Sequence, residues 1–485
     1  MALLAALLVA WLVGWLVVAA AWPAPGIARA AASWVRASVA GGLGLGLSSA
    51  AFVVAIDIGG PSRTAAVVGD LVLLIVAGTW WLSVRRERSL PAVVRMAETG
   101  GQLDRMLGLG VLLLAALFVA IAGLKAIAYP HGESDAWIIW NLKARMMARG
   151  GEGWREALAQ LVASHPDYPL LLPGAVARPW TYVSKETWLA PVVAASAFTT
   201  MTVTLASAVL WLRRTRRLGL IAAVLLLGSP HLADYGLIQN ADVPVAFFLL
   251  AALGLMALAD QQEPRSRTGL VVLAGLALGL ATWTKNEGIL YLVCATGANA
   301  FVTARWHSVR AAAGEVGGLI AGASPLLAIL AYHRATMPLG WVLQQQGVDA
   351  ITRRALDPER YAMIGRALLR GGLDLGGWVV SVVALLILCA LAWGVCVEPS
   401  DRLSASRTAL TLALALLGIL SVYVVTPLPL EWQLGTSLPR LLTQLWPTVV
   451  LLFGLVVESP SLSGSYGDQS PEAQPGPGVR ILCGR

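Results

Sequence analysis

The sequence is short of charge. Asp, Glu, Lys and Arg together make up 13% of its 485 residues, whereas a soluble globular domain carries roughly 25%. Hydrophobic residues make up 57%, and the mean hydropathy is +0.72. This balance excludes a soluble enzyme, a disordered scaffold and a disulfide-rich secreted domain. Cysteine is also scarce, and its four positions show no metal-ligand spacing, so we expect inert packing residues: Cys294, Cys389, Cys396 and Cys483.

Short segments of alternating hydrophobicity are also lacking, which excludes a transmembrane β-barrel. The apolar stretches are continuous, and crossing about 30 Å of hydrocarbon takes roughly 20 such residues. We therefore predict an all-α, polytopic membrane protein with about thirteen transmembrane helices. The predicted spans are 1–21, 38–56, 65–83, 106–127, 188–212, 218–230, 243–260, 269–283, 289–303, 316–333, 372–397, 409–425 and 441–457.

The predicted organisation has three parts. Residues 1–105 hold three N-terminal helices, the first of them a retained span and not a cleaved signal peptide, and a basic cytoplasmic loop. Residues 106–457 form the main membrane region, with a long outer loop at 128–187. Residues 458–485 are rich in Ser, Pro and Gly and are predicted to be a disordered cytoplasmic tail.

The net charge of +8 comes from short basic clusters between apolar stretches, so it indicates cytoplasmic loops and no nucleic-acid partner. Basic residues occupy alternate loops, which places the N-terminus outside and the C-terminus in the cytoplasm. The representative basic positions are Arg85, Arg86, Arg88, Arg95, Arg105, Arg213, Arg214, Arg216, Arg217, Arg265, Arg267, Arg305, Arg310, Arg402 and Arg407. The opposite loops are 128–187, 231–242, 284–288, 334–371 and 426–440.

Five polar clusters fall at the outer ends of these spans: GESDAW, HPDYP, QNADVP, TKNEG and EWQLGTSLPR. Charges at membrane depth cost a few kcal/mol or more and therefore usually serve a function. Because all five clusters lie on one face, they predict a single outward-facing site.

The first cluster opens the long loop. Ser134 is predicted to cap a helix that runs to Arg149 and ends at Gly150. Trp137, Trp140, Ala144 and Met147 recur at helical spacing and predict an amphipathic helix at the membrane interface.

Glu133 and Asp135 lie at the start of that helix. They either complement the helix dipole, worth under about 1 kcal/mol, or provide a general base whose pKa is raised by partial desolvation. In HPDYPLLLPG the prolines predict irregular backbone. His165 and Asp167 there either bind a metal or fix the loop by hydrogen bonds.

The remaining clusters leave similar choices. Asp242 in NADVP either caps a helix or contacts substrate. Lys285 and Glu287 in TKNEG either pair with each other or hold a phosphate, with Lys285 supplying the cation. Arg440 either snorkels to the interface or binds a phosphate through two hydrogen bonds.

At these residues the chain resembles the GT-C superfamily, the integral-membrane glycosyltransferases that use polyprenyl-phosphate-linked sugars. It is most similar to the bacterial branch with protein mannosyltransferase-like and lipid A aminoarabinose transferase-like proteins. The likeness covers roughly residues 105–457 and depends on four stretches in this order: ESDAWIIWNLKARMM with HPDYPLLLP, QNADVPVAFF, ATWTKNEG, and EWQLGTSLPRLLTQLWP.

The resemblance implies a catalytic acid at Asp135, with Glu133 beside it, and donor-phosphate contacts at Lys285 and Arg440. It further implies substrate-binding or site-shaping roles for Lys143, His165, Tyr168, Asn240, Asp242, Glu287 and Trp432. The chain departs from the family pattern in several places. Its acids form Glu-Ser-Asp instead of an adjacent pair, Gln433 stands where relatives have His, three extra spans come first, and no large soluble domain follows.

The implied reaction moves a sugar from a polyprenyl-phosphate donor to a lipid, glycan or protein acceptor, with inversion, on the outer face of the bacterial inner membrane. A carboxylate takes the acceptor proton and the cations stabilise the leaving phosphate. No cofactor is certain; some relatives use a divalent metal, and no dense carboxylate set marks one here. The alternatives are a transporter or lipid flippase, whose charges would line a pathway, and a non-catalytic membrane assembly protein. The long outer loop, and the lack of a repeat, favour the transferase.

Overall fold

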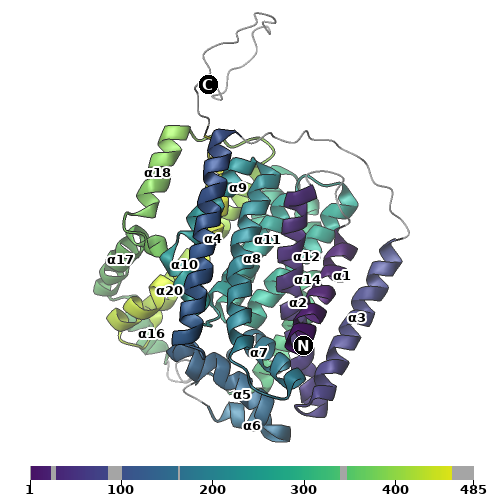
Figure 1. Ribbon diagram of the computed structural model, residues 1–485. Coiled ribbons are helices and arrows are strands. Elements are labelled where there is room, and N and C mark those ends of the chain that lie inside the picture. The colour runs from purple at the N-terminus through teal and green to yellow at the C-terminus, as the bar shows by residue number, and fades with distance from the viewer. Residues whose placement is uncertain (1, 23–28, 86–100, 162–163, 339–346, 461–485) are drawn as a thin grey trace, which may run out of the picture.

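The computed structural model describes residues 2–22, 29–85, 101–161, 164–338 and 347–460. Over these residues the chain is a helical bundle (Figure 1), so the predicted all-α class is confirmed. Eleven helices are long and apolar enough to cross a membrane, and counting each of two bent helix pairs as one span gives up to 13. The chain is therefore a polytopic membrane protein with the expected number of spans. The predicted tail lies almost wholly outside the described residues.

The first half of the described chain contains α1 (Ala2–Ala21), α2 (Arg29–Gly59), α3 (Arg63–Arg85), α4 (Gln102–Ala128), the π-helix η1 (Ala136–Trp140), α5 (Asn141–Arg149), η2 (Gly151–Gly153), α6 (Trp154–Ala159), α7 (Leu171–Val183), α8 (Leu189–Arg213), α9 (Arg216–Leu227) and α10 (Pro230–Leu237). The second half contains α11 (Asp242–Ala259), α12 (Pro264–Thr284), α13 (Glu287–Trp306), α14 (Val309–Thr336), α16 (Val348–Ala355), α17 (Pro358–Leu373), η4 (Leu375–Gly377), α18 (Val382–Trp393), α19 (Arg402–Val425) and α20 (Leu430–Val456).

The span predicted at 372–397 is wrong as a single helix. α17 and α18 meet there at a bend of 77°. Gly376 and Gly377 have φ values of 79° and 73°, a left-handed conformation that glycine adopts without steric cost and that ends a right-handed helix. The short span predicted at 218–230 is also bent, by 64° between α9 and α10.

The long loop at residues 128–187 contains a helix, α7, that was not predicted from the sequence because of its prolines. α7 is buried over ten of its residues, from Leu171 to Trp180. Pro173 lies in its first turn, where backbone N–H groups have no partner within the helix, so a proline costs little. The expected irregular backbone therefore ends at Leu170. Ser49 of α2 donates a hydrogen bond of 2.6 Å to the Leu171 carbonyl.

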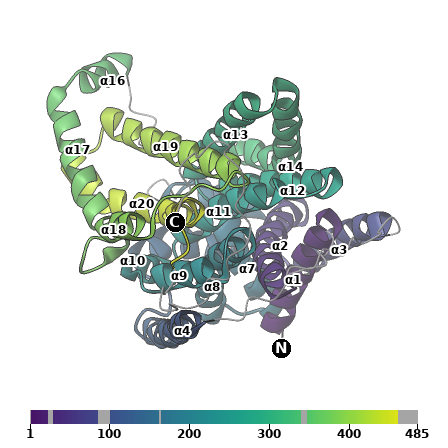
Figure 2. The same cartoon turned by 90° about the horizontal axis from the view of Figure 1, so that it is seen from above.

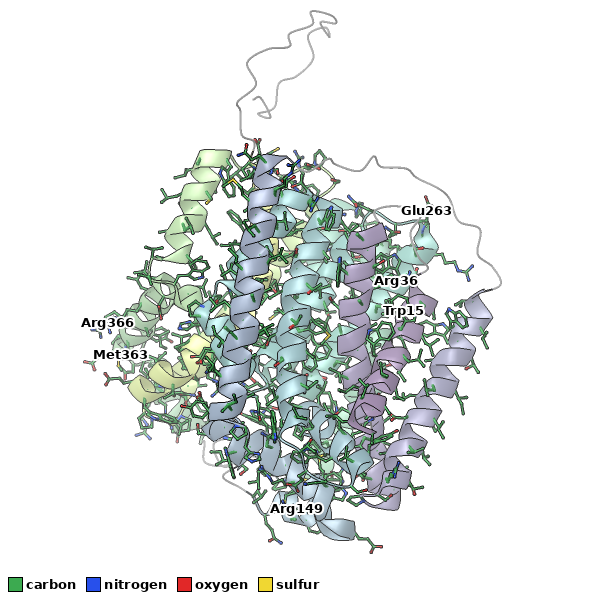
Figure 3. All side chains as sticks on the ribbon, in the orientation of Figure 1. Trp15, Arg36, Arg149, Glu263, Met363 and Arg366 are labelled. Atoms are coloured by element: carbon green, nitrogen blue, oxygen red, sulfur yellow. The ribbon has the colours of Figure 1, made fainter. Side chains whose placement is uncertain are left out.

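The three N-terminal helices brace α7. Arg178 of α7 pairs with Asp70 of α3 at 2.6 Å and donates a 2.8 Å hydrogen bond to the carbonyl of Ala6 in α1. In α2, the Arg36 guanidinium lies 5.1 Å from the ring centre of Trp15 in α1 (Figure 3). The buried Arg178 and Asp70 thus satisfy each other's charge within the bundle.

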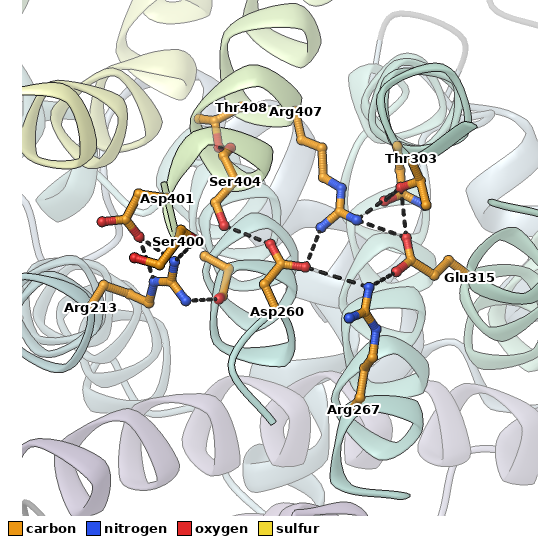
Figure 4. Close-up of polar contacts among 12 residues, drawn as sticks. Arg213, Asp260, Arg267, Thr303, Glu315, Ser400, Asp401, Ser404, Arg407 and Thr408 are labelled. Carbon is orange, nitrogen blue, oxygen red and sulfur yellow. Dashed lines mark hydrogen bonds and ion pairs between the residues drawn. The ribbon is translucent and has the colours of Figure 1, made fainter. Parts of the chain in front are cut away.

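The two ends of the bundle differ. The first described helix starts at the end that carries α5 and α6, here called the site end, and the chain leaves α20 at the opposite end (Figure 1). At that opposite, basic end, Arg407 pairs with Asp260 at 2.7 Å and Glu315 at 2.9 Å (Figure 4). Arg213 pairs with Asp401 beside them. Some of the predicted loop charges are thus buried ion pairs that join helices.

α11 is the central helix. Every one of its residues from Asp242 to Ala259 is buried, and other helices surround it when the bundle is viewed from above (Figure 2). It contacts α8, α12 and α20. The start of α11 therefore lies inside the protein at the site end.

Candidate active site

Asp242, the first residue of α11, is fully buried. Its Oδ1 accepts hydrogen bonds from Lys285 Nζ at 2.8 Å and Gln444 Nε2 at 2.6 Å. Its Oδ2 accepts one from Arg440 Nε at 3.0 Å. Of the two alternatives for Asp242, the helix cap is wrong, because Ala241 is the N-cap residue and the Asp242 carboxylate binds the two cations and an amide. Buried charge is stable only with such partners.

Arg440 extends this network to the long loop at residues 128–187. Its Nη1 donates a 2.5 Å hydrogen bond to Oδ2 of Asp135, so one guanidinium holds two carboxylates from segments far apart in the chain. The side chains of Asp135 and Arg440 are 26% and 22% exposed, whereas Asp242 has no exposed side-chain surface. The network thus runs from the bundle interior towards its surface.

Lys285 lies between two carboxylates. It follows α12 directly and pairs with Asp242 and, at 2.9 Å, with Glu287 at the start of α13. The expected Lys–Glu pair is present, but it is part of a larger cluster. Three carboxylates (Asp135, Asp242, Glu287) face two cations in that cluster.

The helix at Asp135 differs from the expectation in its register. Helical structure already includes Ser134, so Ser134 is not the cap, and the next turn is the π-helix Ala136–Trp140. A π-turn takes more residues than an α-turn. As a result Trp140, Ala144 and Met147 are buried inside the protein while Trp137 is 51% exposed, so the four residues do not share one face as the sequence predicted. The end of the helix at Arg149 is confirmed.

The HPDYP loop joins the network through the TKNEG turn. Asp167 is buried, and its Oδ2 accepts a hydrogen bond of 3.2 Å from Asn286. Arg334 of α14 contacts both Asp167, at 3.4 Å, and Asn286. These contacts match the alternative in which Asp167 fixes the loop by hydrogen bonds. Tyr168 stacks between His165 and Trp140, with ring centres 4.6 and 5.8 Å apart.

Lys143 of α5 is hydrogen-bonded to the backbone of this loop. Its fully buried Nζ donates hydrogen bonds to the carbonyls of His165, at 2.6 Å, and Tyr168, at 3.4 Å. Burial lowers the pKa of Lys143 to about 7, Asp167 opposes this shift and Arg334 adds to it. Burial also lowers the pKa of His165 and raises that of Tyr168.

Three predicted site residues lie apart from the cation network. Glu133 is 41% exposed and lies 3.6 Å from Lys125, which also pairs with Asp234. Trp432 is 60% exposed. Asn240 is buried two residues before Asp242, and its Oδ1 has no hydrogen-bond partner among the described residues. Glu133 and Asp135 are close in sequence but have different ion-pair partners, Lys125 and Arg440.

Sequence reasoning missed Gln444 and Tyr291. Gln444 lies in α20, and its Oε1 accepts a 2.6 Å hydrogen bond from the Tyr291 hydroxyl of α13 while its amide binds Asp242. The available signal was a glutamine inside an apolar run, since polar side chains in membrane spans usually bind something. Asn286 was also passed over, although it stands between Lys285 and Glu287.

A metal site of three or more His, Cys, Asp or Glu side chains is not found within the described part of the chain. The predicted metal alternative for His165 and Asp167 thus has no third ligand of these types among the residues that the structure describes.

Part of the sequence matches a known protein family. Residues 181–329 match the family described as dolichyl-phosphate-mannose-protein mannosyltransferase. The predicted resemblance to the GT-C superfamily is confirmed. The matched segment contains α8 to α13 and most of α14, and with them Asp242, Lys285 and Glu287. No curated protein matches the sequence.

Two solved structures are similar over part of their length. They are ArnT from Cupriavidus metallidurans bound to undecaprenyl phosphate, with 16% identity and a TM-score of 0.45, and the same protein in the apo state, with 15% identity and a TM-score of 0.44. Each alignment covers 70% of this chain and 59% of the ArnT chain. This chain thus corresponds to little more than half of ArnT.

Proposed function

We propose that the protein transfers a sugar from a polyprenyl-phosphate-linked donor to a hydroxyl group of an acceptor. The observation that carries this proposal is the network in which Arg440 holds Asp135 while Asp242 holds Arg440 and Lys285. It brings a partly exposed carboxylate and two cations together at one end of a membrane bundle. The matched mannosyltransferase segment supports the same reaction class.

The chemistry needs one proton acceptor and one anion site. The oxygen of the acceptor hydroxyl attacks the anomeric carbon of the donor sugar, and Asp135 takes the proton from that hydroxyl. The bond from that carbon to the phosphate oxygen breaks on the opposite face, which inverts the configuration. Arg440 and Lys285 neutralise the charge that develops on the departing phosphate.

Asp242 has a positioning role in this proposal. It contacts both cations and is itself fully buried, so it fixes where Lys285 and Arg440 stand. Glu287 orients Lys285 from the other side. A phosphate that engages Arg440 competes with Asp135 for the guanidinium and releases that carboxylate for the acceptor hydroxyl.

The outer-loop residues shape the site. Lys143 holds His165 and Tyr168 in place through their carbonyls. Asn240 and Trp432 have a substrate-binding or site-shaping role around the donor and the acceptor in this proposal. The acceptor is a lipid, glycan or protein on the outer face of the bacterial inner membrane, where the long loop lies according to the positive-inside rule.

Donor binding can be tested with undecaprenyl phosphate, the lipid bound to one ArnT structure. We expect the full chain in lipid nanodiscs to bind it, and Lys285→Met and Arg440→Gln each to weaken binding at least tenfold, because each removes a charged partner worth about 1.5–3 kcal/mol. Arg366→Gln, at an exposed position of α17, is the matched control. Unchanged binding in both site variants would remove the proposed phosphate site.

A further inference from the structure

A cavity of about 330 Å³ lies between α4 and the helices α8 and α9. Its walls are mainly apolar and include Val111 and Phe118 of α4, Val203 of α8 and Leu227 of α9. The volume falls at the lower end of the roughly 300–1,000 Å³ typical of ligand pockets. None of its walls belongs to the Asp135–Arg440 network.

The cavity lies next to the lipid. α4 lies at the front of the bundle in Figure 1 and at its edge in Figure 2, and of its residues only Asp104 and Phe118 are buried. α4 packs mainly against α9, so the cavity separates it from α8. The walls also include the hydroxyl side chains of Thr199, Thr200, Thr204 and Ser207, but most of the lining surface is apolar and suits a hydrocarbon chain.

One end of the cavity carries an arginine. The RRTRR segment supplies Arg213, Arg214 and Arg217, each of which pairs with a carboxylate. Arg216 lines the cavity, and its guanidinium lies 5.5 Å from the ring centre of Trp211. Within the described chain no Asp or Glu oxygen lies within 4.0 Å of it. A cation in the wall of a mainly apolar cavity matches a lipid with an anionic head group.

The position favours a phospholipid of the leaflet at the basic end. The start of α4 is tied to that end, since Asp104 pairs with Arg217 at 2.8 Å, and the cavity begins about two turns further along α4, at Val111. The positive-inside rule assigns this end to the cytoplasm. Basic pockets between transmembrane helices on that side bind anionic lipid head groups.

We propose that this cavity is a binding site for an anionic phospholipid, with one acyl chain between α4 and α8 and the head group on Arg216. The site is independent of the proposed transfer reaction. Its lipid packs α4 onto the bundle, and α4 leads directly into the loop that carries Asp135.

Native mass spectrometry of the full chain, with phosphatidylglycerol and phosphatidylethanolamine of the same acyl composition, tests the proposal. We expect phosphatidylglycerol to be retained in preference. Arg216→Gln should lower that preference about fivefold, because one arginine near anionic lipid contributes about 1 kcal/mol, and Arg216→Lys should restore it. Ala115→Phe, which adds a ring at the cavity wall, should reduce retention of both lipids.

The control is Arg310→Gln, an exposed arginine at the basic end that does not line the cavity. If it lowers the preference as much as Arg216→Gln, general surface charge explains the result and the site is wrong. Full retention in Ala115→Phe would also overturn it. Preferential retention of undecaprenyl phosphate, lost in Ala115→Phe, would show that the occupant is a polyprenyl lipid and not a phospholipid.

Discussion

Arg440 and Asp135 are 305 residues apart in the chain, and their side chains meet at 2.5 Å. The contact joins α20 to the start of the outer-loop helix. The same guanidinium holds the buried Asp242, so the position of Asp135 depends on the central helix of the bundle. This relationship sets the expectations for variants at the site.

Asp135→Asn should reduce transfer by about a hundred- to ten-thousandfold, because it removes the proton acceptor while keeping the size of the side chain. The side chains of Asp135 and Arg440 are only 26% and 22% exposed, so the loss of their ion pair should also cost about 1–3 kcal/mol of stability. Transfer and thermal unfolding are measured on the same preparation. Glu133→Gln is the matched control, since Glu133 faces Lys125. An inactive Glu133→Gln beside an active Asp135→Asn would make Glu133 the base.

Asp242 and Lys285 should be strongly coupled in stability. Removing one member of a buried ion pair leaves an uncompensated charge and costs about 3–5 kcal/mol, although Arg440 and Glu287 provide remaining partners here. We expect Asp242→Asn with Lys285→Met to cost less than the sum of the single changes, by about 1–3 kcal/mol. Unfolding in detergent measures this cycle. The exposed Arg149–Glu186 pair should give under about 1 kcal/mol, and equal values for both pairs would contradict the expectation.

We expect Lys143 to make the free energy of unfolding increase as the pH rises above about 7. Burial lowers its pKa to about 7 in the folded protein, whereas the unfolded chain has the ordinary value near 10.4. Between these values the unfolded state binds more protons, so the free energy of unfolding increases as pH increases. Below pH 7 both states are protonated and this effect disappears. Lys143→Met should flatten the rise in the unfolding midpoint between pH 7 and 10, and an unchanged slope would exclude Lys143 as its source.

The site end should face outward. In a chain without its four native cysteines, a cysteine at the exposed position 153 should react with a membrane-impermeant maleimide in intact spheroplasts. A cysteine at the exposed position 402, at the basic end, should react only after the membrane is opened. The reverse pattern would put the site on the cytoplasmic face.

The positions of most spans were predictable because each depends on a local property, a continuous apolar run of sufficient length. Where the backbone departs from a regular α-helix the expectation failed. The bend between α17 and α18 depends on Gly376 and Gly377, and the exposure of Trp137 depends on a π-turn. Both features depend on small differences in free energy between backbone conformations, which the hydropathy of the sequence does not indicate.

That this is a helical membrane protein with its polar clusters at one end follows from the amino-acid sequence alone, since the cost of burying charge in lipid restricts where such residues can lie. Which of these polar residues contact one another depends on the tertiary structure. In the structure Glu133 and Asp135 have different partners, and Arg440 contacts both Asp135 and Asp242. Gln444 contacts Asp242 and Tyr291. Hydrogen bonds and ion pairs act over about 3 Å, and which atoms come that close depends on how helices distant in the chain pack together.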